Sequence, residues 1–125
     1  MQCVPSDADS KNRNMILINT TFSIDTNIRD EFVRFLFDTY IPLAEACGAY
    51  NPLLTAIKMK PEPNIITGQP TVCLALQMRM PDSQALTGFR REALPRIHQA
   101  IGQSWGPAAG MFETEMDVIK SPAND

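Results

Sequence analysis

The stretch "MILINTTFSID", Met15–Asp25, decides the fold of this 125-residue chain. Apolar side chains recur at every second position (Ile16, Ile18, Phe22, Ile24), as is typical of a strand with one face in a core. The opposite row is mixed, because leucine and methionine alternate there with asparagine, threonine and serine. Such a row is too apolar for open water and too polar for a deep interior. We therefore expect its partner to be a second protein surface.

From this strand outward, the hydrophobic period alternates between two and about 3.6 residues. We predict a helix from the cap candidates Asp25–Asn27 to a C-terminal Gly48, strands at 53–60 and 71–80, a helix from 81–83 to 105, and a strand at 111–119. The order is β-α-β-β-α-β, an α+β fold of ferredoxin-like topology. It predicts a four-stranded antiparallel sheet in the order 4-1-3-2, with both helices on one face.

Both predicted helices contain a proline, Pro42 and Pro95, at similar distances from their starts. Proline lacks the N–H of a helical hydrogen bond, and its ring clashes with the preceding turn. We expect each helix to kink, or to break and restart, near Tyr40–Ile41 and near Ala93–Leu94.

One domain is expected at residues 15–119, with a disordered leader at 1–14 and a polar tail at 120–125. The net charge is −3 without a basic run, which excludes nucleic acid as a partner, because phosphate binding needs a concentrated basic surface. No apolar run approaches the roughly 20 residues of a membrane span. Three widely spaced cysteines without a C-x-x-C motif fit a reducing compartment, so we predict a cytoplasmic protein.

Alternation assigns one row of each strand to the helix layer and the other row to an open sheet face. In the two outer strands, the rows expected under the helices are Leu53, Thr55, Ile57 and Met59, and Phe112, Thr114, Met116 and Val118. The open face would then contain Leu54, Ala56, Lys58 and Lys60 at one edge and Met111, Glu113, Glu115 and Asp117 at the other. A twofold-related second copy could cover this face and pair the acidic edge with the basic one, which predicts a homodimer.

His98 is the only histidine, so a multi-histidine metal site within one subunit is excluded. His98 and Trp105 share a flank of the second helix, and with Tyr40 they could form the polar part of a pocket between helices and sheet. The alternative is a half-exposed histidine beside an anchoring tryptophan.

On the open face, Asn19, Gln77 and Arg79 form a candidate polar patch that could hold an oxygen-bearing aromatic ligand or an enolate. The alternative is hydrogen bonding across a dimer seam. Glu113, Glu115 and Asp117 could bind a divalent ion, although such a row is more often ion-paired. We expect no metal and no cofactor. RNA recognition on this fold would need aromatics on the open face of the first and third strands, where none stands.

Two segments, "YIPLAEACGAYNPLLTAIKM" and "ALPRIHQAIGQSWGPAAGMFETEMDVI", resemble the bacterial family named domain of unknown function 4286. The resemblance rests on Ile41–Pro42, the "ACGAY" turn, Leu94–Pro95 and Trp105–Gly106, and covers residues 15–119. It implies a dimeric α+β barrel, the superfamily that also holds cofactor-independent antibiotic-biosynthesis monooxygenases. It supplies no catalytic residues.

The sequence therefore predicts a small homodimeric binding or structural module without catalysis. The alternative is a cofactor-independent monooxygenase or isomerase that acts on a small aromatic or polyketide-like molecule. The two differ in whether the space between helices and sheet is a cavity or is filled by Phe32, Phe35, Leu76, Met78 and Phe89.

Overall fold

A computed structural model describes residues 15–58, 60 and 62–119 of the chain. The elements are β1 (Ile16–Asp25), the 3₁₀ turn η1 (Thr26–Ile28), α1 (Arg29–Phe35), the π-turn η2 (Leu36–Tyr40), α2 (Ile41–Ala46), β2 (Tyr50–Ala56), β3 (Thr71–Met80), α3 (Ser83–Gly88), the π-turn η3 (Phe89–Ala93), α4 (Leu94–Trp105), the 3₁₀ turn η4 (Gly106–Ala108) and β4 (Ala109–Asp117). The predicted leader and tail lie outside the described residues, as does Met59.

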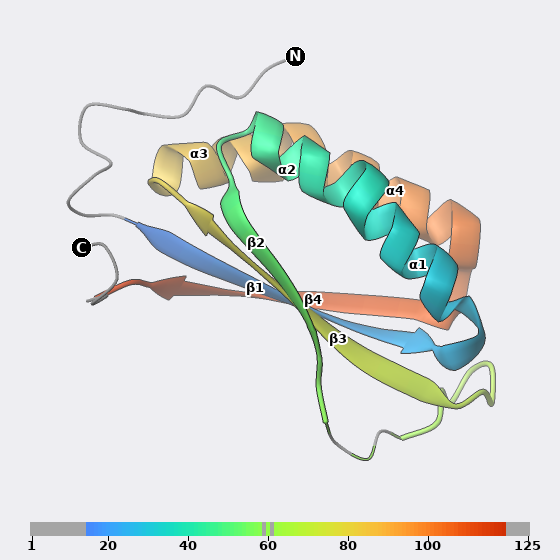
Figure 1. Ribbon diagram of the computed structural model, residues 1–125. Coiled ribbons are helices and arrows are strands. Elements are labelled where there is room, and N and C mark those ends of the chain that lie inside the picture. The colour runs from blue at the N-terminus through green and yellow to red at the C-terminus, as the bar shows by residue number, and fades with distance from the viewer. Residues whose placement is uncertain (1–14, 59, 61, 120–125) are drawn as a thin grey trace.

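The four strands form one antiparallel sheet in the order β2-β3-β1-β4. The helices lie together on one face of this twisted sheet and leave the other face uncovered (Figure 1). The predicted ferredoxin-like α+β fold is therefore confirmed, including the strand order. Within the described residues, no helix is long and apolar enough to span a bilayer.

Each of the two helical segments contains a π-turn that ends two residues before its proline, at Tyr40 and at Ala93. The N–H of Ile41 donates to the carbonyl oxygen of Leu36, and the N–H of Leu94 donates to that of Phe89, so both bonds span five residues. This wider turn gives the rings of Pro42 and Pro95 room beside the preceding carbonyl groups. The helices are thus interrupted at the two places predicted from the prolines.

The ends of the helical segments lie near the predicted positions, although one predicted cap makes no side-chain hydrogen bond. The Asp82 carboxylate caps α3 by accepting a 2.9 Å hydrogen bond from the N–H of Ala85. Gly48 follows α2 with a φ of 111°, a conformation that favours glycine. Of the cap candidates at 25–27, Asp25 stands at the N-cap of η1, which leads directly into α1, but its side chain makes no capping hydrogen bond and accepts one from Asn64 instead.

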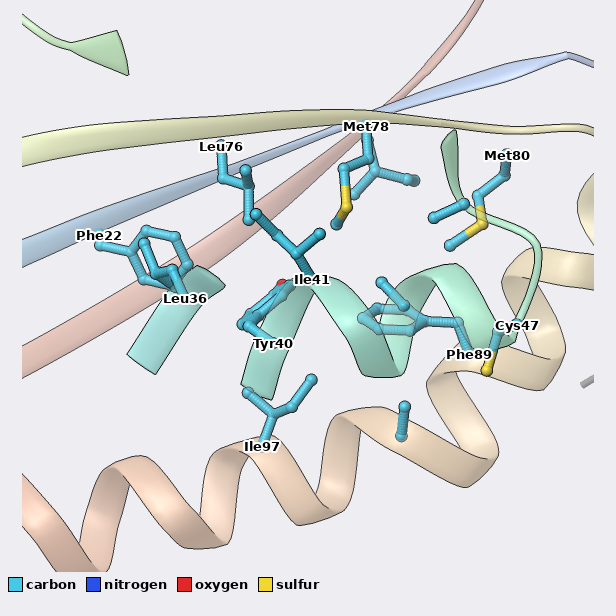
Figure 2. Packing of buried hydrophobic residues seen from close by; sticks show 14 of the residues in the cluster. Phe22, Leu36, Tyr40, Ile41, Cys47, Leu76, Met78, Met80, Phe89 and Ile97 are labelled. Carbon is cyan, nitrogen blue, oxygen red and sulfur yellow. The ribbon is translucent and has the colours of Figure 1, made fainter. Parts of the chain in front are cut away.

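The core lies between the helices and the inner rows of the two central strands (Figure 2). Phe22 contacts the rings of Phe32 and Tyr40 edge-on, with centroids 5.1 and 5.8 Å apart. The other buried residues of the core include Ile16, Ile18, Ile24, Leu36, Ile41, Cys47, Leu74, Leu76, Met78, Met80, Phe89, Ile97 and Ile101. For β1 and β3 these are the rows that alternation assigned to the core.

The face assignments of both edge strands are wrong by one residue. In β2, Leu54 packs against the core while Leu53 is exposed, because a bulge between Tyr50 and Leu53 resets the register. The bulge contains Asn51, at a φ of 54°, and Pro52, which only an edge strand tolerates.

In β4 the acidic row faces the helices. Glu113 and Glu115 lie opposite Thr20 and Ile18 of β1, on the core side, whereas Phe112 and Met116 lie opposite Thr21 and Leu17 on the open side. Hydrophobicity alone would place Phe112 and Met116 on the core side and the glutamates on the open side. Both carboxylates face the helix layer, where Arg90 pairs with them: Glu113 is partly buried there and Glu115 stays exposed.

Candidate functional site

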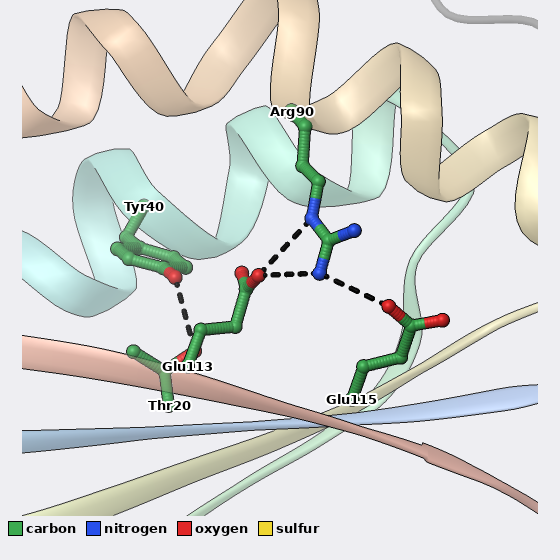
Figure 3. Close-up of polar contacts among 5 residues, drawn as sticks. All are labelled: Thr20, Tyr40, Arg90, Glu113 and Glu115. Atoms are coloured by element: carbon green, nitrogen blue, oxygen red, sulfur yellow. Dashed lines mark hydrogen bonds and ion pairs between the residues drawn. The ribbon is translucent and has the colours of Figure 1, made fainter.

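The most concentrated polar group near the core joins β1, β4 and the two π-turns (Figure 3). Tyr40 is fully buried, and its hydroxyl shares a 3.4 Å hydrogen bond with Thr20, in which either group can donate. Burial raises the pKa of Tyr40 to about 12, and the negative charge of nearby Glu113 adds to this effect, against the hydrogen bond of Thr20, which lowers the pKa. Tyr40 is therefore a neutral phenol across the physiological pH range.

Glu113 is held against this phenol by an arginine. Arg90 donates to Glu113 Oε1 from Nε at 3.1 Å and from Nη2 at 2.8 Å, and Nη2 also lies 3.2 Å from Glu115 Oε1. The hydrogen bond to Glu113 raises the pKa of Arg90 further above its ordinary value, so the guanidinium stays charged. The second oxygen, Glu113 Oε2, is buried and accepts no hydrogen bond from the described residues.

Both helical members of this cluster come from π-turns: Tyr40 ends η2, and Arg90 is the second residue of η3. π-turns are frequent at functional sites, because the extra residue redirects side chains. The two prolines were a usable sequence signal for these positions. No signal linked Arg90 to β4, since alternation placed Glu113 on the opposite face.

The three predicted pocket residues do not converge. Tyr40 is buried, whereas His98 is exposed on α4. Trp105 is partly buried at the far end of α4, where its ring packs edge-on against Phe32 and its Nε1 donates a 2.8 Å hydrogen bond to Glu31. This arrangement anchors the end of α4 to α1.

The open face contains the predicted polar patch in its central strands. Asn19 and Gln77 are directly paired across β1 and β3, and Arg79 pairs with Leu17 on the same face. Asn19 donates to the Thr21 hydroxyl over 3.4 Å. Between these longer polar groups, the centre of this face has the short side chains of Thr21, Ala75 and Cys73, and Cys73 is a free thiol.

The two edge strands add large apolar side chains to the same face. Leu53 on β2 is 54% exposed, and Phe112 and Met116 on β4 are 63% and 38% exposed. The predicted acidic edge is absent here, because Glu113, Glu115 and Asp117 belong to the opposite row, and the predicted basic residues Lys58 and Lys60 lie beyond the end of β2. Of the strand residues named on this face, only Arg79 is charged.

The described residues contain no cluster of three or more histidine, cysteine, aspartate or glutamate side chains that could hold a metal ion. The acidic row of β4 is instead an ion-paired row, with Arg90 as the partner of two of its carboxylates. Its chemistry is that of a structural clamp between the helix layer and an edge strand.

Fold and site together define a small α+β protein of the ferredoxin-like class. The chain belongs to the family Domain of unknown function (DUF4286), which matches residues 15–119, so the resemblance inferred from the sequence is confirmed. No protein of curated function matches the chain.

Three solved structures share the fold at low sequence identity. A candidate antibiotic biosynthesis monooxygenase from Bacillus cereus is 17% identical with a TM-score of 0.56, over 88% of this chain and 98% of that chain. A dimeric ferredoxin-like protein from an uncultured marine organism is 8% identical with a TM-score of 0.58, over 86% and 97%. The de novo designed protein Foldit4 is 7% identical with a TM-score of 0.55, over 82% and 96%. Since a designed protein shares the fold, the fold alone assigns no activity.

Proposed function

We propose that this protein is a homodimeric structural or binding module, in which two copies pack their open sheet faces against each other. The observation that carries the proposal is the outward orientation of the apolar rows of both edge strands. Leu53, Phe112 and Met116 are exposed on the face that the helices leave uncovered. Apolar groups gathered on one face of a monomer mark an interaction surface.

A second copy fits this surface better than a charged partner does. The open row of the strands contains one cation, Arg79, and one carboxylate, Asp25, which is 2% exposed and accepts a hydrogen bond from Asn64, so the surface is nearly neutral. Two identical neutral faces can meet without repulsion around a twofold axis. A solved structure with this fold is itself described as a dimeric ferredoxin-like protein, which supports the same assembly here.

The polar centre of the face has a defined part in this dimer. Asn19, Gln77 and Arg79 would supply hydrogen bonds across the seam, where they replace the water that a lone sheet would bind. The apolar edge residues would surround this centre and exclude solvent from it.

The packing under the helices favours a module over an enzyme. The side chains Phe32, Leu76, Met78 and Phe89 are buried in the space where the alternative, a monooxygenase or isomerase, would need a cavity. His98, a candidate proton acceptor, is exposed outside that space. Native mass spectrometry of freshly purified protein tests this point, since a retained small molecule would contradict a solvent-free, purely structural interior.

Sedimentation equilibrium tests the dimer directly. Phe112→Ser should raise the dissociation constant of the dimer by roughly a hundredfold or more, because each copy loses an aromatic contact worth up to about 2 kcal/mol. Phe37→Ser is the matched control: Phe37 is 53% exposed but lies on η2 in the helix layer, so its loss should leave the constant unchanged. A wild-type protein that sediments as a monomer at tens of micromolar would refute the proposal.

A further inference from the structure

The loop between β2 and β3 presents two neighbouring isoleucines to solvent. Ile65 is 96% exposed and Ile66 is 73% exposed, which makes them among the most exposed large apolar side chains that the structure describes. Exposing two branched side chains at adjacent positions is unfavourable for an isolated chain. The hydrogen bonds of the loop show whether its conformation holds the two isoleucines in these exposed positions.

The loop is held in one conformation by Asn64. The Asn64 side chain donates to Asp25 Oδ1 at 2.9 Å and to the Pro107 carbonyl at 2.8 Å, which ties the loop to the end of β1 and to the turn before β4. Asn64 Oδ1 accepts hydrogen bonds from the N–H groups of Ile66 and Thr67 at 2.9 and 3.2 Å.

The backbone closes the same loop on itself. The N–H of Asn64 donates to Gln69 O at 2.9 Å, and the N–H of Gly68 donates to Asn64 O at 2.7 Å. Gly68 has a φ of 75°, which a glycine adopts without strain. The base is fixed as well, because the N–H of Thr26 donates to Pro70 O at 2.8 Å. The two isoleucines therefore project from a loop whose backbone is held by hydrogen bonds, so much of the cost of ordering that backbone is met before any partner binds.

We infer that residues 62–70 form an arm that embraces the second copy of the chain at the end of its sheet. This inference rests on the proposed dimer and adds a contact to it beyond the sheet faces. The loop extends beyond the start of β3, at the end of the sheet where β1 ends (Figure 1), and from there it can reach around the end of a copy packed on the open face. The tip from Ile65 to Gln69 has no charge, which matches the nearly neutral face and does not suit an anionic lipid surface or nucleic acid.

The double variant Ile65→Ser/Ile66→Ser tests the arm by sedimentation equilibrium of the full chain. Both side chains point into solvent, so the variant should keep the circular dichroism spectrum and unfolding midpoint of the wild type. Its dimer dissociation constant should rise by roughly tenfold or more, a factor that corresponds to ~1.4 kcal/mol. Phe37→Ser, the exposed control on the helix layer, should not change the constant.

A second variant, Asn64→Ala, tests whether rigidity matters. It keeps both isoleucines but removes the hydrogen bonds that aim them, so the dissociation constant should rise while the isoleucine contact area is retained. Its unfolding midpoint shows whether the fold is intact.

The outcomes separate the arm from the dimer. A wild-type dimer whose constant is unchanged in the double isoleucine variant overturns the arm and leaves the proposed function standing, whereas a wild-type monomer overturns the proposed function. Co-sedimentation with phosphatidylcholine–phosphatidylserine vesicles that the double variant loses, with an unchanged dimer constant, would overturn the arm in favour of a lipid contact.

Discussion

Alkaline pH should destabilise the protein through a single buried phenol, that of Tyr40. Burial raises its pKa from 10.0 to about 12. The folded state therefore keeps the proton over a pH range in which the unfolded state loses it. The stabilising contribution is fully present below pH 10 and is lost as the pH rises toward 12. At ~1.4 kcal/mol per pKa unit, the free energy of unfolding should fall by roughly 2–3 kcal/mol across this interval.

Urea denaturation followed by circular dichroism at a series of pH values measures this loss. The informative quantity is the difference between the wild type and Tyr40→Phe, because this difference cancels the effects of alkaline pH that both proteins share. The variant should lose roughly 2–3 kcal/mol less than the wild type between about pH 9.5 and pH 12. Tyr50→Phe controls for the loss of a phenol elsewhere in the chain. Equal losses in the wild type and Tyr40→Phe would show that the hydroxyl is not shielded from water, and the reasoning about the cluster would fail.

Substitutions at Arg90, Glu113 and His98 probe the remaining candidate residues. Arg90→Met leaves the carboxylate of Glu113 without its cation, so urea denaturation should show a loss of roughly 1–2 kcal/mol, below the value for a fully buried pair because Arg90 is partly exposed. Adding Glu113→Leu should recover much of that loss, and a double variant no more stable than Arg90→Met would contradict the pairing. His98→Ala should change neither stability nor the dimer constant, since surface substitutions stay within about 0.5 kcal/mol; a loss above 1 kcal/mol would show an unrecognised contact.

The central strands and the topology could be predicted from the sequence because each central strand has one face that is clearly more apolar than the other. In β1 and β3, one row is apolar except for Thr20 and the other is mixed, so period two is enough to determine which face is buried. The prolines gave the helix interruptions for a similar reason: the missing N–H has the same consequence in any surroundings.

The prediction of which face is buried failed for the edge strands, because that face depends on contacts with residues far away in sequence. The carboxylates of β4 lie inward only because Arg90 approaches from η3, and the register of β2 depends on a bulge at Asn51. An apolar row that faces outward, such as that of Phe112, contradicts the hydrophobic rule unless another protein surface covers it. For the same reason, the buried contact between Tyr40 and Thr20 could not be predicted from either residue alone.

The π-turns before Pro42 and Pro95 also affect how this family should be aligned with its structural neighbours. Each residue of an α-helix advances about 100° around the axis, so one additional residue within a turn rotates everything after it by that angle. An alignment that counts straight through η2 or η3 would match inward positions of one helix to outward positions of another. A single-residue gap placed at each π-turn would restore the phase, and residue equivalences along α2 and α4 are meaningful only once those gaps are in place.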